Sequence, residues 1–170
     1  THLFNAMSPF THREPGMVGA ALNNGSLYTG LIADGYHVDP AVIEIALAAK
    51  RGPARIFLVT DAMSSVGTDM TEFHLNGRRI IRSDGKLTLE DGTLAGADVD
   101  MHAEVLFMHD KAGLELEECL RMASLYPARC MGVEKQLGNL KPGAKANFVH
   151  LSPENNLSGI WLNGRLVDRS

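Results

Sequence analysis

The stretches that decide the fold class are LYTGLIA at residues 27–33, DPAVIEIALAAKR at 39–51 and ARIFLVT at 54–60. The first and last are short, unbroken apolar runs, which is typical of buried strands. The middle stretch has helical spacing, with Asp39 as the expected N-cap and Pro40 at the first helical position. A strand–helix–strand order with apolar strands predicts an α/β fold built on a parallel sheet covered by helices.

Composition excludes several classes of protein. The 170 residues carry 16 basic and 20 acidic side chains, a net charge of −4, so no basic field is available for nucleic acid or an anionic membrane. No apolar run approaches the roughly 18 residues that a membrane span needs. Cys119 and Cys130 are too few for a disulfide framework, so we expect reduced thiols in a cytoplasmic protein.

The rest of the chain adds antiparallel and helical segments. Residues 72–89 alternate around Asn76-Gly77 and Asp84-Gly85, which predicts a β-hairpin insert. Helices are expected at 14–24, at 98–112 with Asp98 as the cap, at 115–124 and at 126–132. Short strands follow from residue 138. We therefore predict two parts, residues 1–137 and 138–170.

Two polar residues follow the predicted parallel strands. His37 and Asp61 lie just beyond the carboxyl ends of these strands, which is where chemistry is found in parallel sheets and barrels. A carboxylate there can serve in proton transfer, although a turn cap is an equally good interpretation of Asp61 from the pattern alone. Most lone histidines are structural, and we assign His74, His102, His109 and His150 to structure.

Other candidate residues give weaker signals. The seven histidines do not form a compact zinc motif. Arg13 could clamp a phosphate, but a loop arginine is more often simply solvated. Residues 92–96, GTLAG, are interpreted as a flexible loop able to wrap a small ligand.

Several longer motifs together resemble a known family. They are THLFNAM with REPG, GYHVDP, LVTDAM, TLAG and LRMASLYPARCMGVEKQLGNLKPGAKANFVHL, and they occur in order from residue 1 to 151. In this order and spacing the chain resembles the C-terminal portion of the N-acetylglucosamine-6-phosphate deacetylases of the amidohydrolase superfamily. The resemblance implies part of a (β/α)8 barrel plus the C-terminal strands of a small β-sandwich. It also implies that the chain is a fragment, inactive in isolation because upstream metal ligands, a Glu and a His, are missing.

The resemblance also assigns roles to residues. His2 matches a metal ligand, Asp61 the catalytic aspartate, His37 a histidine that hydrogen-bonds the sugar, and Arg13 the arginine that grips the phosphate, in the family sometimes across a dimer interface. The further implied substrate-binding residues are Asn5, Ala6, Leu94, Ala95 and Gly96.

The implied reaction is hydrolysis of N-acetyl-D-glucosamine 6-phosphate to D-glucosamine 6-phosphate and acetate. A divalent metal, first of all Zn²⁺ and otherwise Fe²⁺, Mn²⁺ or Co²⁺, would activate water, and Asp61 would move its proton. The expected partner is this small amino-sugar phosphate, with a homodimer or higher homo-oligomer at full length. The alternatives are another amidohydrolase, such as an adenine deaminase or a dihydroorotase, or an inert structural fragment.

Overall fold

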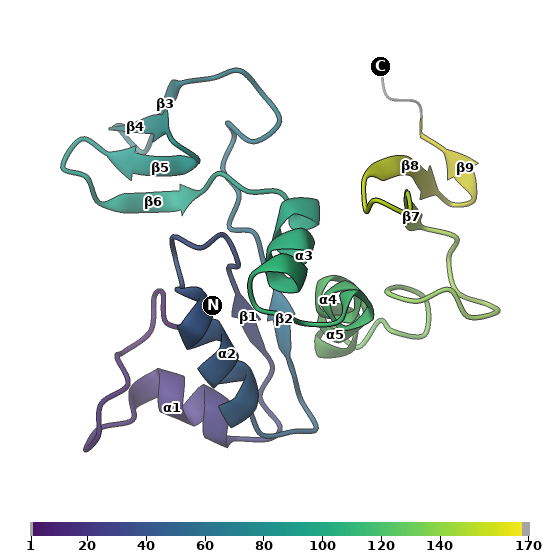
Figure 1. The fold of residues 1–170 in the computed structure, drawn as a ribbon, viewed down its shortest axis with the longest axis horizontal. Helices are drawn as coiled ribbons and strands as arrows, with labels where there is room; N and C mark the ends of the chain where they lie inside the picture. Colours follow the sequence, from purple (N-terminus) through teal and green to yellow (C-terminus); the bar gives the residue numbers. More distant parts are fainter. Residues whose placement is uncertain (1, 168–170) are drawn as a thin grey trace.

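The structure, a computed structural model, describes residues 2–167. Its elements form a small parallel sheet with helices around it, a four-stranded antiparallel sheet and a three-stranded C-terminal sheet (Figure 1). The elements are α1 (Gly16–Asn23), β1 (Thr29–Leu31), α2 (Pro40–Ala49), β2 (Ile56–Leu58), β3 (Glu72–Leu75), β4 (Arg78–Ser83), β5 (Lys86–Leu89), β6 (Leu94–Ala97), α3 (Met101–Asp110), α4 (Leu116–Ala123), α5 (Leu125–Cys130), β7 (Phe148–Leu151), β8 (Leu157–Leu162) and β9 (Arg165–Leu166).

The parallel pair predicted from the sequence is present. β1 and β2 pair in parallel from Thr29 opposite Ile56 to Leu31 opposite Leu58. The pairing continues outward on both sides through isolated parallel bridges, His2 to Gly30 and Ala62 to Ala97. Four extended segments therefore run in the same direction, and the polar residues that follow them gather at one end.

Helix α2 connects the two strands as expected. Asp39 caps it by accepting a hydrogen bond from the Ala41 amide at 2.8 Å, and Pro40 occupies the first turn, where a missing N–H costs nothing. Ile43 and Ala46 face the core. The crossover thus follows the local signals in the sequence.

The insert is larger than predicted. β3, β4 and β5 form the expected antiparallel hairpins within residues 72–89, and β6 adds a fourth strand. Leu94, Ala95 and Gly96 therefore belong to a strand, so their interpretation as a flexible loop is wrong. The reason is that the chain turns at Gly92, whose φ is +84°, and then pairs with β5. The sheet lies beyond the ends of β1 and β2 (Figure 1).

Helix α3 begins later than predicted. Its cap is Asp100, which accepts from the Ala103 amide at 2.8 Å, and not Asp98. Asp98 instead forms an ion pair with Arg82 of β4, whose Nε donates a hydrogen bond to Asp98 Oδ2 at 2.7 Å. This ion pair ties the insert to the start of α3, and a tertiary contact has overridden a local capping signal.

The apolar core lies between the parallel pair and the helices. Its fully buried large side chains come from the first residues, β1, β2, α2, α3 and α4. They include Leu3, Leu31, Ile43, Leu58, Met108 and Met122. Cys119 lies in this core and Cys130 at the surface, and both are free thiols as expected.

A carboxyl group is buried within this core. Glu104 of α3 is 0% exposed, and its Oε1 accepts the Ala33 amide at 2.8 Å, just past the end of β1. Its Oε2 has no partner. Burial, with smaller contributions from Asp34 and Asp100, raises the pKa of Glu104 to about 8. The side chain therefore holds α3 against the end of β1 in its neutral form near pH 7.

The C-terminal strands form a separate antiparallel sheet, β7–β8–β9, with Phe148 stacked on Trp161 at 4.9 Å. One anchor to the rest of the chain comes from α3, where His102 Nε2 lies 2.7 Å from the Asn155 carbonyl oxygen. His109 and His150 also have partners within the chain, in keeping with structural roles. The division into residues 1–137 and 138–170 stays a prediction, and residues 168–170 of the predicted second part lie outside the described residues.

No helix within residues 2–167 has the length and apolar character that crossing a bilayer requires.

The buried carboxyl of Glu104 predicts a pH-dependent stability. Its folded pKa of about 8 lies above the value of 4.5 for a free side chain, so between these pH values the folded state binds the proton and the unfolded state does not. The free energy of unfolding should therefore fall as pH rises from about 5 to 9, by on the order of 2–5 kcal/mol. Glu104→Gln keeps the acceptor for Ala33 and should remove this fall. Urea unfolding at a series of pH values measures it.

Glu44→Gln, at an exposed position of α2, is the matched control and should follow the wild-type curve. Parallel curves for the wild type and Glu104→Gln would show that Glu104 is ionised in the folded protein.

Candidate active site

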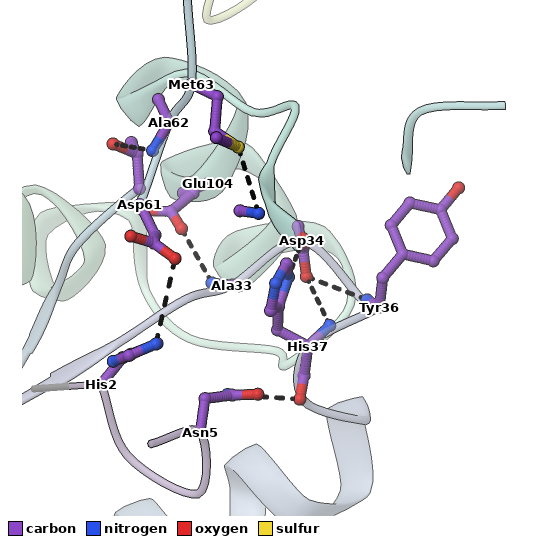
Figure 2. Close-up of polar contacts among 12 residues, drawn as sticks. His2, Asn5, Ala33, Asp34, Tyr36, His37, Asp61, Ala62, Met63 and Glu104 are labelled. Carbon is purple, nitrogen blue, oxygen red and sulfur yellow. Dashed lines mark hydrogen bonds and ion pairs between the residues drawn. The ribbon is translucent and has the colours of Figure 1, made fainter. Parts of the chain in front are cut away.

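The candidate site lies where the parallel segments end. His2 belongs to the first segment, Asp34 and His37 follow β1, and Asp61 follows β2. Figure 2 shows these side chains converging on one region, with Asn5 beneath them. Residues far apart in the sequence meet here because parallel strands bring their carboxyl ends to the same edge.

Asp61 and His2 face each other across this region. Asp61 Oδ2 lies 3.9 Å from His2 Nε2, and the two side chains are 49% and 26% exposed (Figure 2). The backbone of Asp61 has a φ of +50°, a conformation that non-glycine residues rarely adopt. The Ala97 amide donates to its carbonyl oxygen at 3.0 Å and holds this turn. Strained backbone of this kind is concentrated at functional sites.

His37 is held by a carboxylate three residues earlier. Asp34 Oδ2 lies 2.6 Å from His37 Nδ1, and both side chains are nearly buried. The hydrogen bond with Asp34 raises the pKa of His37, and this outweighs the opposite effect of burial. Burial acts to raise the pKa of Asp34, but its hydrogen bonds from His37 and Tyr36 lower it on balance.

The first loop connects to the His37 loop through Asn5. Its Nδ2 donates to the carbonyl oxygens of Leu3 at 3.2 Å and of His37 at 3.4 Å. Phe4 and Ala6 on either side of it have positive φ values, 70° and 43°. This tight turn leaves Ala6 exposed beside the loops that carry the other candidates.

A groove of about 770 Å³ runs from Asp61 to the insert. Residues 61–64 line one side and Leu94, Ala95 and Gly96 another, with Asn76 and Arg78 from the insert. Gly96 packs so closely that a Cβ there would lie 2.8 Å from the Asp61 carbonyl oxygen and 2.6 Å from Met63 Cγ. The structure thus brings Asp61 together with residues 94–96, which line the groove as part of strand β6.

Arg13 lies apart from these residues. It is exposed in the segment between the first loop and α1, and within the described residues no hydrogen bond or ion pair joins it to the other candidates. This segment, in purple, extends away from the ends of β1 and β2 where the site lies (Figure 1). The structure of one chain does not bring Arg13 to Asp61.

The fit of these residues to a divalent metal is partial. Among residues 2–167 no group of three or more His, Cys, Asp or Glu side chains is placed to hold an ion. His2 and Asp61 do supply a nitrogen and an oxygen ligand 3.9 Å apart, close to the roughly 3.4 Å between two ligands of one tetrahedral zinc ion. They can provide two ligands of a site that needs others.

Two residues of this region, Asp34 and Glu104, are not predicted from the sequence. Asp34 follows the apolar run at 27–33 and precedes Gly35, a pair that by itself is typical of a turn. Its spacing to His37, an Asp three residues before a His in a turn, is the signal that could have identified the pair. For Glu104 the sequence holds no signal beyond a charged residue in an apolar helix.

Comparisons with known proteins identify relatives of this chain. A family model described as "Amidohydrolase family" matches residues 1–167. An N-acetylgalactosamine-6-phosphate deacetylase of Escherichia coli O157:H7 is 39% identical over 98% of this chain and 44% of its own length. The human N-acetylglucosamine-6-phosphate deacetylase is 37% identical over 98% of this chain and 42% of its own length. A protein of Escherichia coli (strain K12) with a provisional N-acetylgalactosamine-6-phosphate deacetylase name is 39% identical over 98% of both chains.

Solved structures agree with this result. The N-acetylglucosamine-6-phosphate deacetylase from Pasteurella multocida superposes with a TM-score of 0.93 at 36% identity, over 99% of this chain and 44% of that one. The enzyme from Thermotoga maritima gives 0.89 at 28% identity, over 99% and 46%. Apart from the short strain K12 protein, this chain spans less than half the length of these relatives. From the family match over nearly all of its residues, we conclude that the chain belongs to the amidohydrolase family.

Proposed function

We propose that the protein serves the hydrolysis of the acetamide of an N-acetylhexosamine 6-phosphate, with release of acetate and the amino-sugar phosphate. The observation that carries this proposal is the placement of Asp61 beyond β2, opposite His2 and at the mouth of a groove. Relatives named as deacetylases of two such sugars support it.

Asp61 is the proposed catalytic residue. Its half-exposed carboxylate borders the groove and could accept the proton of a water molecule as its oxygen attacks the acetyl carbonyl carbon. The same proton would pass to the amine nitrogen as the carbon–nitrogen bond breaks. A carboxylate suits this shuttle because it can gain and lose one proton without changing position.

His2 and Asp61 would hold a divalent metal together with ligands from outside this chain segment. The metal, for which zinc is the first candidate, would supply Lewis acidity and lower the pKa of a water molecule to about 7. The nitrogen and oxygen ligands present are compatible with zinc and also with Fe²⁺, Mn²⁺ or Co²⁺.

The substrate would lie in the groove beside Asp61. Leu94, Ala95 and Gly96 would contact it along the β6 edge, and His37 would hydrogen-bond a sugar oxygen. Asn5 and Ala6 would complete the binding site at its base. One chain does not bring Arg13 to Asp61, so Arg13 would bind the phosphate of a substrate molecule held in the site of a second subunit. A homo-oligomer is therefore part of this proposal.

The architecture we propose is the later part of a (β/α)8 barrel, with residues 1–137 in the barrel and 138–170 in a small β domain. Parallel pairing that continues on both sides of β1 and β2 supports this proposal. We place such a metabolic enzyme in the cytoplasm.

The identity of the sugar has two candidates. The deacetylases named for N-acetylgalactosamine 6-phosphate are 39% identical to this chain, and those named for N-acetylglucosamine 6-phosphate are 34–37% identical. The two sugars differ in the orientation of one hydroxyl group. N-acetylglucosamine 6-phosphate is our first proposal, and its galactose epimer the second.

Replacement of Asp61 tests the reaction. In the full-length enzyme, Asp61→Asn should lower kcat about 10²-fold or more, because an amide cannot accept the proton. Release of acetate measures it. Asp69→Asn, a neighbouring exposed aspartate, is the matched control and should keep wild-type turnover. Turnover of Asp61→Asn within a few-fold of the control would contradict the assigned role.

Comparison of substrates tests the sugar phosphate. We expect kcat/KM for N-acetylglucosamine 6-phosphate to exceed that for the unphosphorylated sugar at least about 100-fold, because charged hydrogen bonds to the phosphate are lost. The galactose epimer, measured in parallel, ranks the two candidates. Equal kcat/KM with and without the phosphate would favour a different amidohydrolase substrate.

The close packing of Gly96 gives a further prediction. Gly96→Ala places a methyl group against the Asp61 carbonyl oxygen and Met63, so it should displace the turn that carries Asp61 and lower kcat at least about 10-fold. Gly52→Ala adds the same group with its nearest neighbour, Arg55, 3.9 Å away, and serves as the control. Wild-type kcat in Gly96→Ala would show that the turn adjusts without cost.

A further inference from the structure

Asp34 uses both carboxylate oxygens on one short loop. Oδ1 accepts the backbone amides of Tyr36 and His37, each at 2.9 Å. Oδ2 lies 2.6 Å from Nδ1 of the His37 ring (Figure 2). One side chain thus fixes both the backbone that carries His37 and the orientation of its imidazole.

The pair is shielded from water. The side chains of His37 and Asp34 are only 7% and 6% exposed, which strengthens the hydrogen bond between them and restricts ring rotation. An ionised carboxylate can only accept, so the short contact requires a proton on Nδ1 of His37. Among residues 2–167 no group hydrogen-bonds His37 Nε2, so the hydrogen-bonding capacity of this atom is unused within the chain.

We propose that Asp34 is a positioning residue for substrate binding: it holds His37 with Nδ1 protonated, so that Nε2 is the atom offered to a hydroxyl or phosphate oxygen of the sugar. This inference rests on the proposed function for the identity of the substrate. The state of the His37 ring itself does not depend on it.

The surroundings of the ring support this role. Tyr36, between the two residues, donates its hydroxyl to the Asp84 carbonyl oxygen at 3.0 Å, and Lys86 lies 4.6 Å from the centre of the Tyr36 ring. The loop is therefore tied to the insert that lines the groove. Asp34 and Asp61 are the charged groups that act on His37, and both favour its cationic form, which can donate from Nε2 to an oxygen.

The test is Asp34→Asn, because asparagine keeps an oxygen for the two backbone amides and loses the acceptor for Nδ1. Its amide would donate to Nδ1 and leave the ring proton on Nε2. Histidine ring ¹H–¹⁵N spectra, with the His37 signals assigned from His37→Gln, should show Nδ1 protonated throughout the titration of the wild type. The variant should show the proton on Nε2 and a lower His37 pKa than the wild type, because the hydrogen bond with the Asp34 carboxylate is lost.

Kinetics give the second measurement. With N-acetylglucosamine 6-phosphate and its galactose epimer, Asp34→Asn should raise KM about 10- to 100-fold and leave kcat within a few-fold, because a binding interaction is weakened. The matched control is Asp39→Asn, which removes the same charge and keeps a good helix cap. It should change neither the His37 spectrum nor KM.

The outcomes separate the two proposals. The positioning role is overturned if His37 Nδ1 is still protonated in Asp34→Asn. It is also overturned if the proton moves to Nε2 but KM does not change. If the variant does not fold, the wild-type spectrum decides, since a neutral His37 with its proton on Nε2 contradicts the role. A wild-type enzyme that deacetylates neither sugar phosphate overturns the proposed function. The spectra still show whether Asp34 determines which nitrogen of the His37 ring carries the proton.

Discussion

The parallel pairing of β1 with β2 is the constraint on which the rest of the structure depends. Its register places the ends of both strands at one edge, and the flanking bridges bring His2 and Ala97 to the same edge. Every candidate side chain of the site except Arg13 is delivered by a segment that leaves this edge or by the insert above it. A two-residue change in strand register would move Asp61 by more than 6 Å relative to His2, so backbone hydrogen bonding determines the chemistry.

The predictions from local sequence signals are correct where no residue distant in the sequence competes with those signals. Asp39 and Pro40 start α2, and the Asn-Gly and Asp-Gly turns produce the hairpins of the insert, because capping and turn geometry depend on a few adjacent residues. The wrong assignments, a cap at Asp98 and a loop at 94–96, have a common cause. In each, a distant partner, Arg82 or β5, competes with the local preference and prevails.

The candidate site also has a part that the sequence predicts and a part that depends on contacts between distant residues. That His37 and Asp61 follow apolar strands is visible in the sequence, because the carboxyl ends of such strands are common places for chemistry. That Asp34 orients His37, and that Glu104 is buried behind Ala33, depends on side-chain contacts. The second of these joins residues 71 positions apart, and periodicity contains no information about it. Family resemblance supplied roles for single residues but not the hydrogen bonds that support them.

Glu104 and Asp34 are two carboxyl groups that influence each other electrostatically, and their pKa values shift in opposite directions. Glu104 has one amide donor and an unpaired oxygen, so burial dominates and its pKa rises to about 8. Asp34 has two amide donors and an imidazole, so its pKa falls despite burial. Depth of burial and the number of hydrogen-bond donors together decide which carboxyl keeps its charge. A charged Asp34 can orient a histidine cation, whereas a second anion at Glu104, close behind it, would oppose Asp34 and destabilise the end of β1. The arrangement thus keeps negative charge at the edge where His37 and Asp61 act and excludes it from the core below.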